Sequence, residues 1–315
     1  MAWFLRRLAL SAVLLWLVAS VVFLSVFLIP GDPVEILLSQ EGGGVSREAI
    51  DAVRAERGLD RPLPLIYVER VSRLMRFDFG VSDVDGSPIG AQLATRLPRT
   101  LELIAAASLL SLLIGIPAGV AASLRPRGVF DRVASTLSGV AQSLPVFVIG
   151  SILILVLAQM LRWVPAGGFV DFTADPRQHV VLLLLPATAI AIGLTAIVFR
   201  VTRSSMLEVL PSDYVRTAEA MGLSAPKVIF GHALRTALMP VVTVFALNLG
   251  ALLGGTVLVE YVFNWPGLSG MLVSAVNARD YSAITAVVFV TAALFILLNL
   301  VVDVLFSFLD PRVRK

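Results

Sequence analysis

Long stretches without a charged residue dominate this chain of 315 residues. Six such stretches occur, at residues 8–31, 103–124, 133–161, 180–199, 236–259 and 281–302. Each holds at least 20 residues, and about 20 helical residues are enough to cross the roughly 30 Å hydrocarbon core of a bilayer. The stretches are apolar all round, whereas the strands of a β-barrel would alternate apolar and polar positions. The sequence therefore predicts an all-α integral membrane protein with six transmembrane helices.

Composition excludes a large soluble protein. Only 15% of the residues are charged and the mean hydropathy is +0.90, whereas soluble domains carry about 25% charged residues. The absence of cysteine excludes disulfides and thiolate metal sites. We expect no metal site in this chain.

Basic residues predict the orientation in the membrane, because short connections rich in Arg and Lys lie on the cytoplasmic side. Such residues flank the predicted helices on one side: Arg6, Arg7, Arg125, Arg127, Arg132, Arg200, Arg203, Arg216, Lys227, Arg235, Arg312, Arg314 and Lys315. Both termini are therefore predicted to be cytoplasmic. The first stretch is followed by "FLIPGDP" and has no small-residue cleavage site, which favours a retained anchor over a signal peptide.

The predicted helices divide the chain into four parts. These are an N-terminal anchor (1–31), a small helical extracytoplasmic insertion (32–99), a five-helix core with a cytoplasmic loop at 201–237 (100–303), and a cytoplasmic tail (304–315). Within the insertion, Ser46 is expected to cap a helix that reaches Gly58. A second helix over 62–77 would carry one apolar stripe, made of Leu65, Val68, Val71, Leu74 and Met75.

Prolines, glycines and a few polar side chains interrupt the apolar helices. The prolines are Pro117, Pro145, Pro186 and Pro240, and glycines spaced four apart (115/119 and 250/254) allow helices to approach closely. The uncharged polar side chains are Gln142, Ser143, Thr188, Thr195, Asn248 and Asn299. Our candidates for lining a movable pathway are Gln142, Ser143, Thr188 and Asn248. The alternative for each is a hydrogen bond between helices.

The stretch "DYVRTAEAMGLSAPKVIFGHALR" (213–235) stands out in the cytoplasmic loop. Ser212 is a suitable N-cap for a helix over about 213–221, and Gly222 suits the left-handed residue that ends it. Ser224 and Pro226 then begin a second helix leading into the fifth span. The sequence predicts a short helical elbow.

The same stretch has the spacing of a DNA-binding helix-turn-helix, with Ala218, Gly222 and Val228 at the small, turn and buried positions. Its second helix offers only Lys227 and Arg235 as basic residues. A bilayer within a few residues on both sides also leaves no room to dock in a DNA groove. The pattern is therefore not read as nucleic-acid binding.

At these residues a family resemblance becomes visible. "DYVRTAEAMGLS" and "HALRTALMP" resemble the cytoplasmic coupling loop of inner-membrane permeases of bacterial ATP-binding-cassette (ABC) importers, specifically the dipeptide/oligopeptide/nickel branch. "IPGDP" (29–33), "VEYVFNWPGL" (259–268) and "NLVVDVLFSFLDPRVR" (299–314) agree with it. The general permease loop reads Glu-Ala-Ala, three residues, then Gly. Here Arg216, Thr217 and Ala218 stand in place of Glu-Ala-Ala before Gly222. The peptide branch commonly varies at these positions, so the difference points to that branch of the family.

The resemblance implies a type I ABC importer permease fold in the bacterial cytoplasmic (inner) membrane. It also implies a second homologous permease subunit, two cytoplasmic ATPase subunits that hold ATP and Mg, and an extracytoplasmic substrate-binding protein. The coupling-loop residues would be Tyr214, Arg216, Thr217, Ala218, Glu219, Ala220, Met221 and Gly222. The exposed-helix alternative remains for Arg216 and Glu219.

Several observations bear on mechanism. The sequence contains no Gly-x-x-x-x-Gly-Lys-Ser/Thr loop, so this chain is expected to bind no ATP and to be no enzyme by itself. An intramembrane serine protease is a rival because of "GLSG" (267–270), but no His follows Ser269 to activate it. His232 would lie on the opposite face and His179 in an outside loop.

A secondary transporter is the second rival, and it would show inverted repeats and ionisable groups at mid-membrane. Neither pattern is visible in the sequence. The substrate stays open among dipeptides, oligopeptides, glutathione, and nickel or other chelates. Short peptides are favoured, because a pathway lined by amides and hydroxyls suits a hydrophilic, extended ligand.

Overall fold

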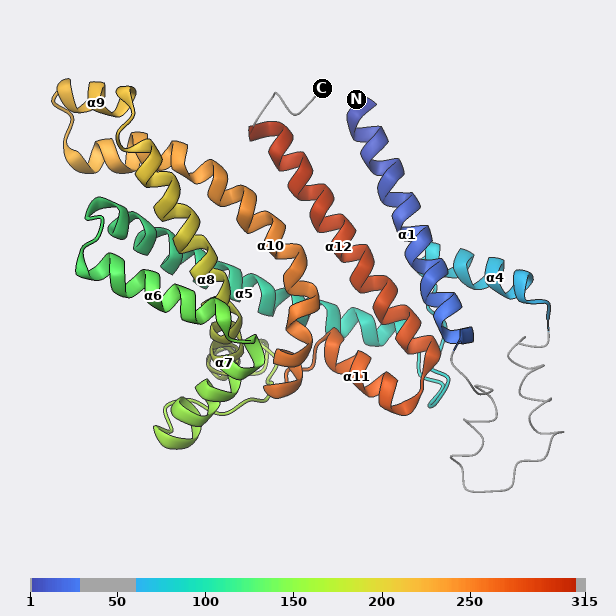
Figure 1. The fold of residues 1–315 in the computed structure, drawn as a ribbon. Helices are drawn as coiled ribbons and strands as arrows, with labels where there is room; N and C mark the ends of the chain where they lie inside the picture. Colours follow the sequence, from blue (N-terminus) through green and yellow to red (C-terminus); the bar gives the residue numbers. More distant parts are fainter. Residues whose placement is uncertain (1, 29–60, 310–315) are drawn as a thin grey trace. The chain divides into compact units, whose positions relative to one another are not determined.

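The computed structural model describes residues 2–28 and 61–309, and its regular elements there are helices (Figure 1). They are α1 (Ala2–Leu28), α4 (Leu63–Met75), α5 (Ile89–Leu124), α6 (Val129–Ser143), α7 (Val146–Leu153), the π-helix η1 (Ile154–Met160), α8 (Pro176–Val209), α9 (Asp213–Ala220), the π-helix η2 (Lys227–Ala233), α10 (Leu234–Val262), α11 (Leu268–Ala278) and α12 (Tyr281–Leu309). The predicted Ser46–Gly58 helix, the "IPGDP" motif and residues 310–315 lie outside the described residues. The all-α prediction is confirmed.

Five of the described helices are long and apolar enough to cross a membrane, and a sixth span exists if one bent helix pair is counted as one. The long helices extend beyond the apolar stretches. α5 begins at Ile89, in the segment predicted as insertion, and α8 continues to Val209. Both helices therefore continue past their apolar stretches into sequence that carries charged residues.

The third predicted span is not one continuous helix. α6 ends at Ser143, α7 begins at Val146, and the two are bent by 109°. Leu144 between them is extended, with φ −94° and ψ 133°. Pro145 has no N–H to continue the helical ladder, and the residue before a proline is driven towards extended backbone. The proline that was predicted to interrupt this span breaks it.

The chain divides into two compact units, Met1–Leu97 with Gly270–Leu300, and Pro98–Ser269 with Val301–Lys315. We call them unit 1 and unit 2 and describe each by itself. In unit 1, α4 packs against α1. The Ser20 and Tyr67 hydroxyls lie 2.7 Å apart, and Phe23 meets the Tyr67 ring edge-on.

The apolar stripe predicted for α4 is partly wrong. Leu65 and Val68 are 60% and 61% exposed. The buried positions are Ile66, Val71 and Leu74. Among the described residues α4 packs mainly on α1, so one narrow row of its side chains is covered, and the row runs through Ile66 rather than through Leu65.

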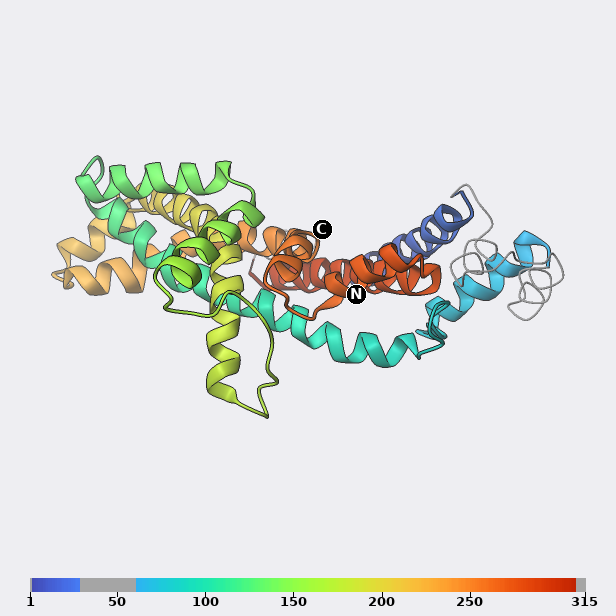
Figure 2. The ribbon, with the colours of Figure 1, turned by 90° about the horizontal axis from the view of Figure 1, so that it is seen from below.

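In unit 2, α8 is the central helix. It packs against α6, α7 and α10. In both views, α9 and the beginning of α10 lie at the same end of the unit as the connection from α5 to α6 (Figure 1, Figure 2). One end of unit 2 therefore gathers both connections that the basic residues predict to be cytoplasmic.

Small residues allow α5 to approach α8 closely. A Cβ added to Gly115 would lie 2.7 Å from the Val198 side chain, and one added to Gly119 would lie 2.6 Å from Thr202. The predicted close approach at this glycine pair is confirmed. In the other pair, nothing among the described residues lies within 4 Å of a Cβ on Gly254.

Candidate functional site

The elbow (residues 213–235) consists of two short helical segments with a shared apolar core. Val215 and Ala218 of α9 are buried against Val228 and Ala233 of η2. The same cluster contains Val120, Met206 and Ala237. The predicted pair of helices is confirmed, and burial of small and β-branched side chains holds them together.

Gly222 ends α9 with the left-handed conformation that the sequence predicts, at φ +79°. The Gly222 N–H donates to the Glu219 carbonyl at 2.9 Å, and the Leu223 N–H donates to the Ala218 carbonyl at 3.3 Å. Leu223 also packs against the cluster that contains Ala218. These two bonds and the apolar contact constitute a Schellman motif, the common helix ending that requires a left-handed residue.

Ser212 does not cap α9 with its side chain. Its backbone is extended at the position before the helix, as predicted. However, its hydroxyl donates to the Val209 carbonyl at 2.6 Å. The predicted N-cap hydrogen bond is therefore wrong, while Asp213 in the first turn still has a favourable charge for the helix N-terminus.

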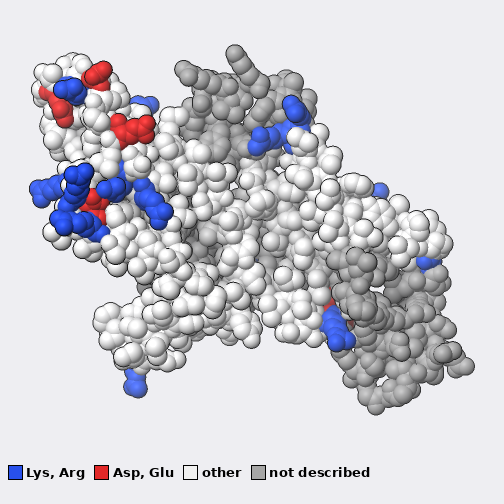
Figure 3. Space-filling model, viewed as in Figure 1, with Lys and Arg blue, Asp and Glu red and all other residues white. Residues whose placement is uncertain are grey.

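Most of the predicted coupling residues lie on the exposed face of the elbow. The exposed ones are Tyr214, Arg216, Thr217, Glu219, Ala220, Met221 and Gly222. Met221 is 76% exposed and Tyr214 44%, while Ala218 is buried inside and supports the face rather than forming it. In Figure 3, acidic and basic side chains are mixed on this part of the molecule. The face has no net charge, because Arg216 and Glu219 balance, and Tyr214 and Met221 give it exposed apolar surface, which suits close contact with another protein surface.

The four pathway candidates are distributed over three helices. Gln142 and Ser143 are exposed at the bend after α6, whereas Thr188 on α8 and Asn248 on α10 are half-buried. Ser143, Thr188 and Asn248 each donate to the carbonyl four residues earlier in their own helix, at 2.7–3.0 Å. No described hydrogen bond joins the four side chains to one another. The alternative role, a hydrogen bond between helices, is therefore not seen for Ser143, Thr188 or Asn248 among the described hydrogen bonds.

A buried carboxylate, Glu260, lies at the end of α10 that is far from the elbow. Glu260 is 1% exposed. Its Oε1 accepts a hydrogen bond from Thr100 Oγ1 at 2.6 Å, and its Oε2 accepts one from the Ser269 N–H at 2.8 Å. Thr100 Oγ1 in turn accepts from the Leu268 N–H at 2.9 Å. Together these groups satisfy two of the free N–H groups at the start of α11.

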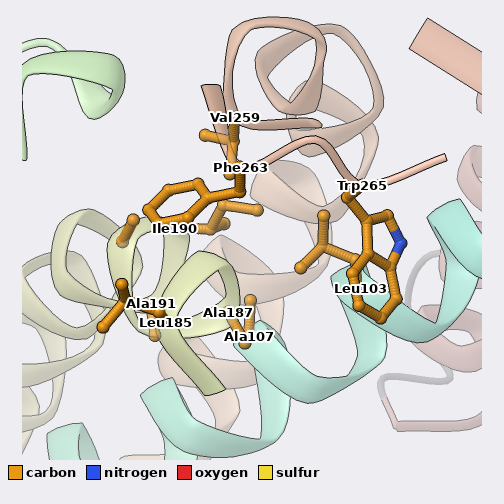
Figure 4. Close-up of a cluster of buried hydrophobic side chains, with 10 residues drawn as sticks. Leu103, Ala107, Leu185, Ala187, Ile190, Ala191, Val259, Phe263 and Trp265 are labelled. Carbon is orange, nitrogen blue, oxygen red and sulfur yellow. The ribbon is translucent and has the colours of Figure 1, made fainter. Parts of the chain in front are cut away.

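We call residues 263–268 the outer turn. Its Phe263 and Trp265 side chains, both 1% exposed, point into a cluster formed by α5, α8 and α10 (Figure 4). Trp265 Nε1 donates to the Arg99 carbonyl at 3.0 Å. A Cβ on Gly267 would overlap the Glu260 carboxylate. The motif "VEYVFNWPGL" is thus a turn closed over its own glutamate, and only glycine fits at position 267.

The expectation that His179 lies in a loop is wrong. It lies in the first turn of α8 and is 2% exposed. Nδ1 donates to the Val170 carbonyl and Nε2 faces Glu102 Oε1, each at 2.7 Å. The Phe169 and Trp265 rings meet the imidazole edge-on. His179 therefore fastens the segment before α8 to α5, and a histidine with both nitrogens so engaged is a structural residue.

Unit 1 has a comparable polar contact at the start of α12. Asp280 accepts hydrogen bonds from the Ser82 hydroxyl at 2.5 Å and from the Ala283 N–H at 3.0 Å. Asp83 accepts from the Ser282 N–H at 2.9 Å. Nearby, hydrogen bonds from the Ser87 hydroxyl and N–H lower the pKa of Asp85 to about 2. Asp280 and Asp83, which accept hydrogen bonds from the first N–H groups of α12, hold the segment before α5 to that helix.

Among the described residues, no group of three or more His, Cys, Asp or Glu side chains could hold a metal ion. The buried carboxylates are instead occupied by protein donors. They act as hydrogen-bond acceptors for turns and helix ends.

Two family models match the chain. Residues 112–315 match the "Binding-protein-dependent transport system inner membrane component" family, and residues 1–104 match the N-terminal model "Binding-prot-dependent transport system membrane comp, N-term". Between them the two matches cover nearly the whole chain.

Curated relatives are similar along almost their full length. The "Probable peptide ABC transporter permease protein y4tP" of Sinorhizobium fredii is 37% identical over 310 residues, which are 98% of each chain. The "Glutathione transport system permease protein GsiC" of Escherichia coli is 38% identical over 300 residues, covering 95% of this chain and 94% of the relative.

Solved structures share the fold at low sequence identity. The inward-facing MetNI methionine ABC transporter matches with a TM-score of 0.58 and 17% identity, over 71% of this chain and 98% of that one. An amino acid ABC transporter with histidines matches with a TM-score of 0.50 and 16% identity, over 70% and 94%. The all-helical architecture with apolar helices is therefore that of type I ABC permeases.

Proposed function

The chain belongs to the family of binding-protein-dependent transport system inner membrane components, and on that premise we propose that it passes short peptides across the bacterial inner membrane. In this proposal it is the membrane-spanning subunit of an ABC importer. Hydrolysis of ATP by partner subunits drives transport. The chain itself is a multi-pass membrane protein of transporter type and not a catalytic enzyme.

One observation carries the assignment of the energy-receiving site. The elbow has a packed apolar core beneath an exposed face on which Arg216 and Glu219 balance in charge, and a Schellman motif fixes the angle between its two helices. A rigid pair of helices can transmit a movement of the ATPase to the membrane helices, whereas a flexible loop would absorb that movement. We assign docking of the ATPase to Tyr214, Arg216, Thr217, Glu219, Ala220, Met221 and Gly222, with Ala218 as internal support.

The proposed assembly contains a second homologous permease, two cytoplasmic ATPase subunits and an extracytoplasmic substrate-binding protein. The sequence supports this division because neither of its two lysines follows a glycine, so it has no phosphate-binding loop of the usual kind. ATP and Mg are assigned to the ATPase subunits, and this chain is assigned no cofactor.

The proposed orientation places both termini and the elbow in the cytoplasm, and the outer turn outside. Its support is the excess of arginine in the short connections. The α5–α6 connection and the elbow lie at one end of unit 2, as that orientation requires (Figure 1).

Short peptides are proposed as the substrate class for two reasons. The relatives are named for peptide and for glutathione, itself a modified tripeptide. The pathway candidates Gln142, Ser143, Thr188 and Asn248 offer amide and hydroxyl groups without charge. Such groups suit the peptide backbone, whose own groups are hydrogen-bond donors and acceptors.

Reconstitution tests the proposed function. The chain alone in proteoliposomes is expected to hydrolyse no ATP and to accumulate no di- or tripeptide. Adding the second permease, the ATPases and the binding protein is expected to give ATP-dependent uptake. A Glu-to-Gln variant in the ATPase's own active site serves as the control for energy source.

Two results would contradict the proposal. Uptake by the lone chain under an ion gradient would indicate a secondary transporter. Uptake of a nickel chelate but of no peptide by the complete assembly would move the substrate class to metal complexes.

A further inference from the structure

α6 buries two polar side chains and exposes its large apolar ones. Asp131 and Ser138 are the buried residues of this helix, at 3% and 8% exposure. Apart from Arg132 and Gln142, its exposed large side chains are apolar, namely Val129 (76%), Phe130 (53%), Val133 (52%), Leu137 (62%) and Val140 (52%). A helix against water shows the reverse arrangement. The outer face of α6 is therefore suited to an apolar neighbour.

A tight turn of arginines stands at the N-terminal end of this face. The Gly128 N–H donates to the Arg125 carbonyl at 3.0 Å, and Arg127 has a left-handed φ of +62°. Arg132 Nε donates to the Arg127 carbonyl at 3.0 Å. These bonds use backbone carbonyls, so they hold the turn in place without neutralising any guanidinium.

The nearby carboxylate is already occupied. Asp131 Oδ1 accepts from Arg203 Nε at 2.5 Å, and Oδ2 accepts from Arg203 Nη2 and from the Arg127 N–H, each at 2.8 Å. We define the arginine patch as Arg125, Arg127 and Arg132, which are all exposed. Within the residues that the structure describes, no member of the patch forms an ion pair. Figure 3 shows basic side chains gathered at this end of the unit with little acid among them.

We propose that the arginine patch and the apolar face of α6 together bind an anionic phospholipid. The phosphate lies against the arginines, which suit it because guanidinium groups form paired hydrogen bonds with phosphate oxygens. The acyl chains lie along Val133, Leu137 and Val140. Basic clusters at the cytoplasmic boundary attract anionic headgroups in the same way.

The dimensions of the surface favour a lipid over a protein. From Val129 to Val140 the helix rises about 16 Å at 1.5 Å per residue, close to half of the roughly 30 Å hydrocarbon core. One charged end followed by an apolar row about 16 Å long resembles the headgroup and acyl chains of a single phospholipid. A second permease subunit on the same face would need acidic residues opposite three exposed arginines.

Native mass spectrometry of the full-length chain, released from nanodiscs of equal phosphatidylglycerol and phosphatidylcholine, tests the proposal. We expect phosphatidylglycerol to be retained at least about fivefold over phosphatidylcholine, because each basic residue near an anionic headgroup adds a several-fold preference. Changing Arg125, Arg127 and Arg132 to Gln is expected to bring the ratio close to one. The same residues changed to Lys keep the charge and should keep most of the preference.

The matched control removes equal charge from the elbow, by Arg216→Gln, Lys227→Gln and Arg235→Gln, and should leave the ratio unchanged. A wild-type ratio near one overturns the proposal, and so does a preference that survives the three Gln substitutions. Displacement of the lipid by inorganic phosphate at about 50 mM, but not by sodium chloride at the same ionic strength, would indicate a site for free anions, because both salts screen exposed charges alike. Cross-linking of Arg132→Cys to a second permease instead of to lipid would assign the face to a protein partner.

Discussion

In the elbow, Val215 and Ala218 bury apolar surface against Val228, whereas beside the outer turn Glu260 and Thr100 bury a carboxylate and a hydroxyl that bond to each other. Apolar burial is non-directional, so the core of the elbow does not require particular side chains on its outer surface. A buried carboxylate needs each of its donors in place, because an unpaired charge or N–H away from water is costly. The two regions of unit 2 should therefore respond differently to substitution. Substitutions at the outer turn should lower the stability of the chain, whereas substitutions on the elbow should weaken binding of the ATPase.

The largest expected effect on stability is that of Glu260→Ala. It removes the acceptor of the Thr100 hydroxyl and of the Ser269 N–H, at about 1–3 kcal/mol for each buried group left unpaired. The thermal midpoint of the purified chain in detergent should fall clearly. The matched control is Glu219→Ala on the exposed face of the elbow, which should leave the midpoint within error. If the two variants lowered the thermal midpoint equally, the proposed difference between the outer turn and the elbow would be wrong.

A smaller loss is expected for Gly267→Ala. The added methyl group overlaps the Glu260 carboxylate, and overpacking of this kind costs about 1–3 kcal/mol. Gly255→Ala is the control, because nothing among the described residues lies within 4 Å of its Cβ and the residue is helical. There alanine should be neutral or stabilise by roughly 0.5–1 kcal/mol. A reversed order of thermal midpoints would show that the outer turn is not closed over Glu260.

Cysteine substitutions should change stability least and report on which side each region lies. Ser224 in the elbow and Asn264 in the outer turn are both exposed, and the absence of native cysteine makes labelling specific. A membrane-impermeant maleimide should label Asn264→Cys in intact cells and Ser224→Cys only after permeabilisation. Asn264 has φ +51°, so cysteine there carries a local cost of about 1–2 kcal/mol. Labelling of Ser224→Cys in intact cells would reverse the proposed orientation.

The sequence predicts the elbow well because its determinants are local. The apolar spacing of Val215 and Ala218 defines a helix face, and glycine at 222 supplies the left-handed ending within the same ten residues. The six apolar stretches are readable for the same reason, since length and hydropathy alone decide them.

The outer turn could not be read in this way. Glu260 pairs with Thr100, which lies 160 positions away in the chain, and a single acid at the end of a span normally faces water. The only local signal was the compact "NWPG" turn that follows it. His179 was misplaced for a similar reason, because its partner Glu102 lies 77 positions away. Long-range partners of single polar residues leave no periodic trace.

The central claim, that the elbow receives the ATPase, is tested most directly at Gly222. Its φ is +79° and no described residue lies within 4 Å of an added Cβ, so a side chain fits sterically and only the backbone conformation is strained. Valine there costs about 1–2 kcal/mol locally and redirects the second helix of the elbow, while asparagine tolerates the left-handed region.

The measurement is a pull-down of the ATPase and a peptide-uptake assay on Gly222→Val and Gly222→Asn, at matched membrane levels. We predict that the valine variant inserts normally, binds the ATPase weakly and loses uptake, whereas the asparagine variant keeps part of both. Full ATPase binding and full uptake by Gly222→Val would contradict the claim that this elbow is the coupling site.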